Sequence, residues 1–598
     1  MKLSRLYTNQ PKHFEPIQFT NGLNVVLGEI KDPANKNKDT HNLGKSTLGR
    51  VLDFCFLSKK DKDFFLFKHE DKFSDFIFYL EIEATPSKFI TIARSVKDAT
   101  KISFKESMSS EADLSDLDES GWTYSGVAFD KAKQLLDTYL DLSEIKPYDF
   151  RKSIGYLIRE QDDYGDVFQL KKFKGSHADW KPYLAHILGF NSKLLETQYE
   201  TEEKIANLVK KEQILNAELG GTLQDLSKIE GTLLIKEKEL KESQDFIDKF
   251  DFSNQDKEKV KTLVERIDLQ SGALNERKYI LTKNKWKIEK SLSEEVIEFS
   301  VNDAESLFKE ANVLFEGQIK KEFSQLIAFN KAIAKERKQY LVAELKEIEN
   351  SLLGMDKESV SLSNERSKLL SFLTDSDSLQ KYKFSSIELV GLKSEVEVLK
   401  RQRDSINKLR DLRKEIRATN TELGEVQESI ENDVESKNSE STSFFSKVRI
   451  YFNEIIERVI NHKAVLNVFP NKEGHLEFKV EILDENHQPT SADVGHSYKK
   501  LLCIAFDMAI ARAHSANKFP KFIFHDGIFD SLDDRKKVNL KDVLNEYASY
   551  GVQHIITLID SELPVEYSTK DKFFSKEDII LLLNDSGDLG RLFKFKSW

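Results

Sequence analysis

The sequence predicts an α/β domain whose two halves are split by a long antiparallel α-helical coiled coil. The first observation is the placement of proline: the 598 residues contain 10 prolines, and none lies between Pro182 and Pro470. Proline inside a helix removes a hydrogen bond and costs about 3 kcal/mol, so its absence favours long helices. The second observation is that both ends of the chain carry short apolar runs typical of buried strands. We therefore expect one half of the domain at 1–190, a helical arm at 191–440 and the other half at 441–598.

Composition narrows the class of protein. The 91 basic and 102 acidic residues give a net charge of −11, so no overall basic field favours nucleic acid. The two cysteines, Cys55 and Cys503, exclude a disulfide framework and a four-cysteine zinc site. The first residues lack the apolar core of a signal peptide, and no run approaches the roughly 20 apolar residues that cross a bilayer. We expect a soluble, cytoplasmic protein without a membrane segment.

The N-terminal half carries a phosphate-binding motif. Residues 17–28 and 76–96 read as strand pairs, and between them lies the segment Asn42-Leu43-Gly44-Lys45-Ser46-Thr47, which opens a helix after a loop. This is the second part of the P-loop pattern G-x-x-x-x-G-K-[ST]. Backbone N–H groups at the helix start attract anions, Lys45 would reach the β- and γ-phosphates, and Ser46 would ligate Mg²⁺.

The P-loop pattern is incomplete. Its first glycine would fall at position 39, which is Asp39, and several polar residues separate Gly28 from the usual register. A chance Gly-Lys-Ser-Thr at a helix start is the alternative interpretation.

A second candidate ligand follows an apolar segment at 149–161. The segment ends in Arg159, Glu160 and Gln161, and the amide of Gln161 could reach a bound Mg²⁺ or its water if it follows a strand. An ordinary loop residue is the alternative.

The middle of the chain shows heptad spacing. Apolar residues recur at three- and four-residue intervals from Leu208 to Leu240, and at seven-residue intervals from Leu409 to Ile430. Polar residues such as Arg413 occupy companion positions of the second seam, which lowers its stability. We expect two antiparallel arms with a turning tip near 296–330 and interruptions at 251–255 and 375–378.

The C-terminal half again has the features of an α/β sheet. Residues 464–483 read as two strands, and a polar loop at 491–499 leads into an apolar helix. The apolar run 522–524 ends in Asp526, at the end of a strand where α/β proteins present their chemistry. Asp533 follows seven residues later, and 552–559 reads as a further buried strand.

This order of features resembles the SMC/RecN class of ABC ATPases. Within that class it is similar to the bacterial SMC-like proteins of multi-component defence operons, including the Lamassu type. The resemblance implies that both ends fold into one ATPase head, and that two heads enclose two ATP molecules, each head contributing its signature loop to the other's nucleotide. The resemblance covers the whole chain in architecture, although the specific motifs cover only a small part of it.

The resemblance also implies roles for individual residues. Asn42, Gly44, Lys45, Ser46 and Thr47 correspond to the Walker A segment, and Gln161 to the Q-loop residue near Mg²⁺. The signature and D-loop positions correspond to Ser491, Gly495, Ser497, Lys499 and Asp533. Asp526 corresponds to the Walker B aspartate, so that the expected Mg²⁺ ligands are Ser46, Gln161 and Asp526.

Three departures bear on catalysis. The signature serine is replaced by Gly495, the glutamate expected after Asp526 is Gly527, and the histidine expected after the last strand is absent. A positioned base is typically worth about 10²–10⁴-fold, and Asp530 or His525 could substitute for the glutamate. We therefore expect Asp526 and Asp530 as the catalytic residues, binding of ATP with Mg²⁺, and hydrolysis that is slow or dependent on a partner.

Two functions of different classes follow. The first is an ATPase whose ATP-gated head dimerisation senses or tethers DNA, as the core of a DNA-maintenance, repair or anti-phage and anti-plasmid defence complex. Its partners would be a second copy of the chain, DNA, and accessory and effector subunits of the same operon, including a nuclease if DNA is cut. The lysines at 59–62 and 171–174 are candidate DNA contacts. The second is a non-hydrolysing coiled-coil scaffold with a degenerate head, and a plain cytoskeletal coiled coil is a third reading.

Overall fold

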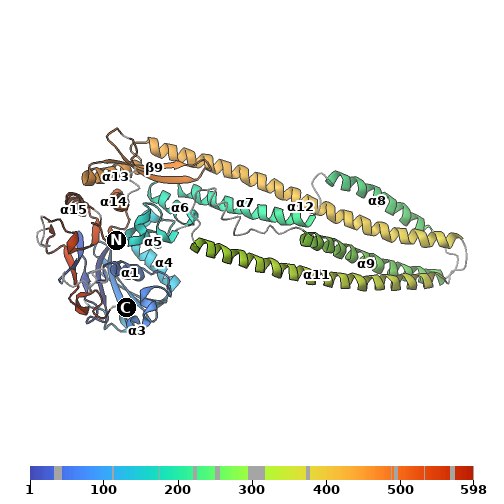
Figure 1. Ribbon diagram of the computed structural model, residues 1–598, viewed down its shortest axis with the longest axis horizontal. Coiled ribbons are helices and arrows are strands. Elements are labelled where there is room, and N and C mark those ends of the chain that lie inside the picture. Colours follow the sequence, from blue (N-terminus) through green and yellow to red (C-terminus); the bar gives the residue numbers. More distant parts are fainter. Residues whose placement is uncertain are drawn as a thin grey trace. The chain divides into compact units, whose positions relative to one another are not determined.

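The structure is a computed structural model and divides into two compact units, each described here by itself (Figure 1). Unit 1 comprises residues 1–205 and 419–598, and unit 2 comprises residues 206–418. The described residues are 1–31, 43–110, 113–173, 175–219, 225–249, 256–293, 317–371, 377–486, 488–490, 496–530, 532–565 and 573–596. No helix within these ranges is both long and apolar enough to cross a membrane.

The centre of unit 1 is a five-stranded sheet in the order β13-β3-β12-β11-β8, with every neighbouring pair parallel. Its strands are β3 (Leu23–Glu29), β8 (Ile158–Arg159), β11 (Phe522–His525), β12 (Gln553–Ile559) and β13 (Ile579–Asn584). Strands β3, β11 and β12 are buried along nearly their whole length, as expected when both faces of a parallel sheet are covered. The strands predicted at 522–524 and 552–559 are confirmed.

A second sheet of unit 1 is antiparallel, in the order β2-β1-β4-β5-β6-β7. Its strands are β1 (Lys2–Thr8), β2 (Ile17–Gln18), β4 (Ile77–Thr85), β5 (Lys88–Ser95), β6 (Lys101–Ser107) and β7 (Tyr124–Ala128). Strands β4 and β5 confirm the hairpin predicted at 76–96. A separate hairpin of β9 (Lys463–Pro470) and β10 (Leu476–Leu483) confirms the strands predicted at 464–483.

Helices cover these sheets. They are α1 (Lys45–Cys55), α2 (Phe65–Lys68), α3 (Glu70–Phe73), α4 (Phe129–Leu140), α5 (Phe150–Leu157), α6 (His177–Ile187), α13 (Phe444–Ile460), α14 (His496–Ala513) and α15 (Asp534–Ser549). Helix α1 lies close to the parallel sheet, because a Cβ at Gly49 would come within 2.7 Å of the Phe524 ring. Residues of both chain ends form one continuous hydrophobic core.

The segment 149–161 differs from the sequence prediction. Most of it is helix α5, which begins after Asp149, whose carboxylate accepts a hydrogen bond from the Lys152 N–H. Only Ile158 and Arg159 form a strand, β8. The helix explains the apolar character of 150–157, because its four large residues Phe150, Ile154, Tyr156 and Leu157 are buried in the core.

Unit 2 consists of helices, and the pairing of those helices is more complex than two arms. They are parts of α7 (Ser192–Leu219) and α12 (Asp377–Ser439), together with α8 (Asp225–Asp248), α9 (Asp256–Ser293) and α11 (Gly317–Ser371). Ion pairs Lys236–Glu395 and Arg413–Glu212 show that α8 and α7 run antiparallel to α12. The predicted seam is present there, since Leu215, Leu226 and Ile229 pack against Ile406 and Leu409.

Helix α9 runs in the opposite sense. Its Asp268 bonds Ser386 of α12, and its Glu276 pairs with Arg401 further along α12, so these two helices are parallel. Helix α11 lies beside α9 and is antiparallel to it, as the Lys285–Glu349 pair and Figure 1 show. The chain therefore reverses between α8 and α9 and again between α11 and α12, where the sequence predicted mere interruptions.

The single pair of antiparallel arms is consequently not confirmed. The predicted tip at 296–330 lies partly outside the described residues, and its residues from Gly317 onward belong to helix α11. Asp268 stabilises the folded-back arrangement by accepting bonds from Arg366 Nε and Ser386 Oγ, each at 2.7 Å. Heptad spacing identifies the apolar faces of the helices but does not specify which helix covers each face. The prediction and the structure differ in that pairing of helices.

Candidate functional site at the carboxyl edge of the parallel sheet

The predicted phosphate loop ends in a conformation that requires glycine. Gly44 precedes helix α1 with φ of 99°, in the left-handed region. A Cβ at this position would also lie 2.7 Å from the Cβ of Leu592. Asn42 lies outside the described residues. Only glycine therefore fits here, directly before the exposed N-terminal turn that Lys45, Ser46 and Thr47 begin.

Lys45 extends along the end of β3 toward two carboxyl groups. A Cβ at Gly28 would be 3.4 Å from Lys45 Cδ, so this glycine leaves room for the lysine chain. The ammonium acts on Asp530 and Glu562, in each case lowering the pKa of the carboxyl. Ser46 is exposed and Thr47 is partly exposed in the same helical turn. The Lys45 ammonium, with the Ser46 hydroxyl in the same turn, therefore lies at the carboxyl edge of the parallel sheet, close to the carboxyls that follow β11 and β12.

Asp526 lies directly after β11 and is 5% exposed. The hydroxyl of Thr557, on the neighbouring strand β12, donates a 2.5 Å hydrogen bond to Asp526 Oδ1 and accepts one from the Gly527 N–H at 2.9 Å. This bridge fixes the carboxylate at the edge of the sheet. Because one oxygen faces Thr557, the other is the candidate acceptor for a metal-bound water.

Gly527 occupies the position where the resemblance expects a glutamate. Its φ is 60°, and a Cβ there would lie 2.5 Å from Asp530 Oδ2 and 3.0 Å from Lys500 Nζ. Those two groups form an ion pair with an Nζ–Oδ2 distance of 2.7 Å. The space in which a side chain at 527 would begin is therefore filled by the Lys500–Asp530 pair.

Glu562 completes this cluster, and the sequence analysis missed it. It ends the short 3₁₀ helix Asp560–Glu562 that follows β12, and its Oε2 accepts a 3.0 Å hydrogen bond from the Ile559 N–H. Burial and the hydrogen bond to Asp530 raise the pKa of Glu562 to about 8. Burial alone would raise the pKa of Asp530, but the bonds to Glu562 and Lys500 outweigh it and hold that pKa below its usual value.

The signal that could have found Glu562 is its position after a buried strand. The rule that led to Asp526, that strand ends at the carboxyl edge present chemistry, applies equally to residues after β12. Lys500 was also missed, because it lies one residue beyond the segment compared with the signature motif. It is 6% exposed and its ammonium lies 4.6 Å from the centre of the Tyr164 ring.

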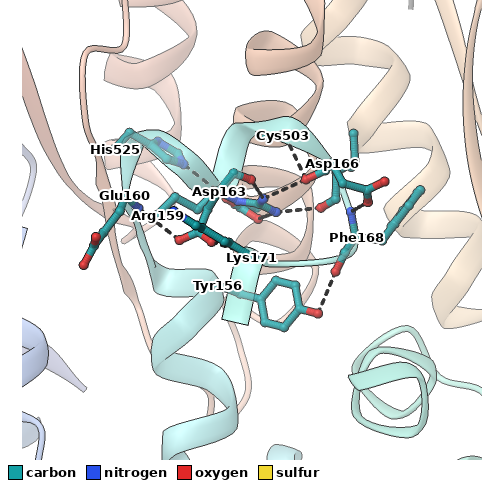
Figure 2. Close-up of polar contacts among 11 residues, drawn as sticks. Tyr156, Arg159, Glu160, Asp163, Asp166, Phe168, Lys171, Cys503 and His525 are labelled. Atoms are coloured by element: carbon teal, nitrogen blue, oxygen red, sulfur yellow. Dashed lines mark hydrogen bonds and ion pairs between the residues drawn. The ribbon is translucent and has the colours of Figure 1, made fainter. Parts of the chain in front are cut away.

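Gln161 begins a 3₁₀ helix, Gln161–Gly165, and its side chain is exposed. The residue before the loop, Arg159, is instead fully buried and makes a bidentate ion pair with Asp507 of α14 (Figure 2). The Arg159 Nε–Asp507 Oδ2 and Nη2–Oδ1 distances are 2.6 and 3.0 Å. Arg159 also donates to the carbonyls of Asp163, Asp166 and Val167, so one guanidinium fixes the whole Gln161 loop to α14.

His525, the alternative base of the sequence analysis, belongs to this buried cluster. Its Nε2 lies 3.3 Å from Asp507 Oδ2, and Figure 2 shows the ring beside Arg159. Burial lowers the pKa of the fully enclosed imidazole. The structure thus directs His525 toward Asp507, whereas Asp530 is the group that lies near Lys45.

The remaining predicted residues are only partly described. Ser491 and Gly495 lie outside the described residues, as does the side chain of Ser497 at the start of α14. Lys499 is partly exposed on α14. Asp533 caps helix α15 by accepting from the Lys536 N–H at 3.1 Å, and its carboxylate pairs with Lys536 Nζ at 2.7 Å. Asp533 therefore stabilises the start of helix α15, and this role is independent of the predicted D-loop role.

The residues at this edge can be tested for their fit to nucleotide and Mg²⁺. The cradle at Gly44, the opening at Gly28 and the adjacent Lys45 suit a phosphate chain. Among the described residues no group of three or more His, Cys, Asp or Glu side chains is arranged to hold a metal ion. A Mg²⁺ site here would therefore rely on Ser46, Gln161, Asp526 and phosphate oxygens, since nucleotide-bound Mg²⁺ usually takes few protein ligands.

Comparisons with known proteins give matches of fold and of one family model. Residues 455–597 match a family described as "Uncharacterised protein conserved in bacteria (DUF2326)". No curated protein matches the chain. The chain is similar to solved structures of SMC head domains that include a coiled coil.

Two of these structures are archaeal. One is the SMC head with a coiled coil and joint from Pyrococcus yayanosii, with 16% identity, a TM-score of 0.35, and coverage of 94% of this chain and 92% of that chain. The other is the SMC head with an extended coiled coil from Pyrococcus furiosus, bound to the C-terminal domain of ScpA, with 12% identity, a TM-score of 0.33, and coverage of 94% and 90%. The SMC head of Thermotoga maritima matches with 18% identity and a TM-score of 0.16, covering 26% of this chain and 47% of that chain.

Proposed function

We propose that this chain is an SMC-like ABC-type ATPase that binds ATP with Mg²⁺ at the carboxyl edge of the parallel sheet. The observation that carries the proposal is the convergence of Lys45, Asp526 and Asp530 at the carboxyl edge of the parallel sheet, next to Gly44, whose left-handed backbone only glycine adopts readily. Lys45 and the N–H groups of the first turn of α1 would hold the phosphates. Ser46, Gln161 and Asp526 would hold Mg²⁺, which neutralises charge that develops on the phosphates.

The proposed organisation of the chain is one head domain interrupted by a helical insertion. Residues 1–190 and 441–598 form the two halves of one head, and 191–440 is a helical insertion. The continuous core shared by both ends of the chain supports this organisation. The signature segment at 491–499 would complete the nucleotide site of a second copy, so ATP would drive homodimerisation of heads.

The proposed biological role is DNA sensing or tethering. Head dimerisation would sense or tether DNA as the core of a cytoplasmic DNA-maintenance or defence complex with accessory and effector subunits. The candidate DNA contacts at 171–174 are weakened by the structure, because Lys171 pairs with Asp162 and burial lowers the pKa of Lys172. Salt-sensitive binding of duplex DNA, measured with and without ATP, tests this part separately.

Nucleotide binding is tested with the full chain and a fluorescent ATP analogue. Lys45→Ala should lose at least tenfold in affinity, because the cation beside the β- and γ-phosphates is removed. Lys131→Ala, at an exposed position of α4, is the matched control and should bind normally. Equal affinity of wild type and Lys45→Ala would contradict the proposed site.

The scaffold alternative is favoured by one observation, the glycine at position 527 in place of a glutamate. It predicts nucleotide binding without turnover. Phosphate release measured with and without DNA and co-purifying partners separates the two functions, since a scaffold releases none under any of these conditions.

A further inference from the structure

The loss of the side chain at position 527 is matched by a specific arrangement of its neighbours. Asp530 Oδ2 lies 2.5 Å from where a Cβ at Gly527 would be, and Lys500 Nζ lies 3.0 Å from it. A side chain at 527 would therefore displace the Lys500–Asp530 pair from its observed position, on a backbone strained at φ of 60°. The acidic side chain beside position 527 is thus that of Asp530, held by a lysine from α14.

Asp530 alone is poorly suited to accept a proton. Its carboxylate is bound to Lys500 and to Glu562, which hold its pKa below the usual value although burial opposes this. A base with a low pKa takes a proton from water only weakly. Asp530 therefore serves as the anion that organises the cluster.

Glu562 has the complementary properties. It is half-buried after the end of β12, the strand between β3 and β11. The Ile559 N–H donates to one of its oxygens and fixes it. The groups that face it are Asp530, across the shared hydrogen bond, and Lys45. Burial and Asp530 raise the pKa of Glu562 to about 8. Two carboxyls whose environments separate their pKa values are a recurrent sign of acid–base chemistry.

From this geometry, and resting on the proposed nucleotide site, we propose that Glu562 is the general base for ATP hydrolysis, in place of the glutamate missing at position 527. Asp530 and Lys500 are its positioning residues. The ionised Glu562 carboxylate removes one proton from a water molecule while the water oxygen bonds to the γ-phosphorus. The bond from that phosphorus to the β,γ-bridging oxygen breaks, and its electron pair leaves with ADP. Lys45, adjacent to both carboxyls, would place the γ-phosphate beside Glu562.

The test compares wild type with Glu562→Gln, using the full chain. Single-turnover phosphate release should fall by about 10²–10⁴-fold in Glu562→Gln, whereas affinity for the fluorescent ATP analogue should change less than threefold. Glu577→Gln, at an exposed glutamate near β13, is the matched control and should hydrolyse ATP as wild type does. Unchanged turnover in Glu562→Gln would overturn the inference.

The pH profile supplies a second readout. Because the base must be ionised, wild-type turnover should rise about tenfold per pH unit up to about pH 8 and then level off. Asp530→Asn removes the neighbouring anion and should move this midpoint to lower pH, and a ¹³C NMR titration of the Glu562 carboxyl without nucleotide should show the same displacement. A midpoint that Asp530→Asn leaves unchanged would overturn the inference.

The two proposals fail in distinguishable ways. Wild type that binds no ATP analogue contradicts the proposed nucleotide site itself. Wild type that binds the analogue and releases no phosphate between about pH 6 and pH 9.5 overturns the role of Glu562 but leaves the nucleotide site intact.

Discussion

Helix α14 contributes to two clusters of charge that differ in how deeply they are buried. Around Asp507, seven residues after Lys500, the Arg159 guanidinium uses Nε, Nη1 and Nη2 in bonds to one carboxylate and three carbonyls, with no exposed surface. Around Lys500, the carboxyls of Asp530 and Glu562 are hydrogen-bonded to each other and remain half-exposed. A fully buried ion-pair cluster fixes structure, whereas a partly exposed pair of carboxyls can exchange protons with solvent. The comparison therefore assigns architecture to the first and chemistry to the second.

The largest expected effect is a loss of stability when the buried Arg159–Asp507 cluster is broken. Asp507→Ala leaves the Arg159 cation buried without its partner, which should lower the free energy of unfolding by about 3–5 kcal/mol. Urea denaturation followed by circular dichroism measures it. The double variant Arg159→Met/Asp507→Leu removes both charges and should recover most of that loss. A loss below about 1 kcal/mol in Asp507→Ala would show that the ion pair does not hold the loop.

A substitution at Gly527 should damage the second cluster. Gly527→Glu restores the residue type that the family resemblance expects, yet its Cβ would collide with Asp530 Oδ2 and its backbone would be strained at φ of 60°. Strain of this kind costs on the order of 1–3 kcal/mol. We expect lower stability and slower phosphate release than in wild type. Faster release in Gly527→Glu would show that the site accommodates a glutamate at this position and uses it.

The raised pKa of Glu562 predicts a dependence of stability on pH. In the folded chain Glu562 keeps its proton up to about pH 8, whereas in the unfolded chain it loses that proton near the ordinary glutamate pKa of 4.5. The folded state thus binds more protons between these values, and this group's contribution to stability falls as pH rises from about 4.5 to 8. Because the carboxyl is half-exposed, we expect on the order of 1–2 kcal/mol over this window.

Glu562→Gln should remove this component, so the difference in unfolding free energy between variant and wild type should grow in the variant's favour with pH. Denaturant titrations at several pH values measure it. A difference that is constant across the window would mean that Glu562 titrates normally.

The smallest effect concerns Asp533. Its carboxylate caps helix α15, so Asp533→Ala should cost about 1 kcal/mol in unfolding free energy, while Asp533→Asn should cost little, since asparagine caps equally well. Thermal unfolding of both variants checks this. A loss of ATP-dependent dimerisation in Asp533→Asn at normal stability would add the D-loop role that the sequence predicts.

The sequence predicted the parts of the site that local patterns encode. The Gly44-Lys45-Ser46-Thr47 segment, the strand before Asp526 and the strand at 552–559 each carry a signal within a few residues. Glu562 has no such signal, because its role depends on its contact with Asp530 across the sheet edge. Arg159 was predicted only as part of the end of the apolar segment 149–161, because its partner Asp507 lies far away in the sequence.

The helical character of the middle of the chain was predicted, but the way in which its helices pair was not. The two heptad seams were predicted separately, and in the structure Leu215 and Leu226 of the first pack against Leu409 of the second. They could not reveal that α9 runs parallel to α12, which depends on Asp268 bonding both Arg366 and Ser386. A polar residue that joins three helices is indistinguishable in sequence from a solvated one.

The most direct test of the account is a structure of the full chain with Mg²⁺ and a non-hydrolysable ATP analogue. We predict that the phosphates lie on the N–H groups at the start of α1, with the γ-phosphate between Lys45 and Glu562 and a water molecule in contact with the Glu562 carboxylate. A nucleotide bound elsewhere, or a γ-phosphate distant from Lys45, would contradict the central claim.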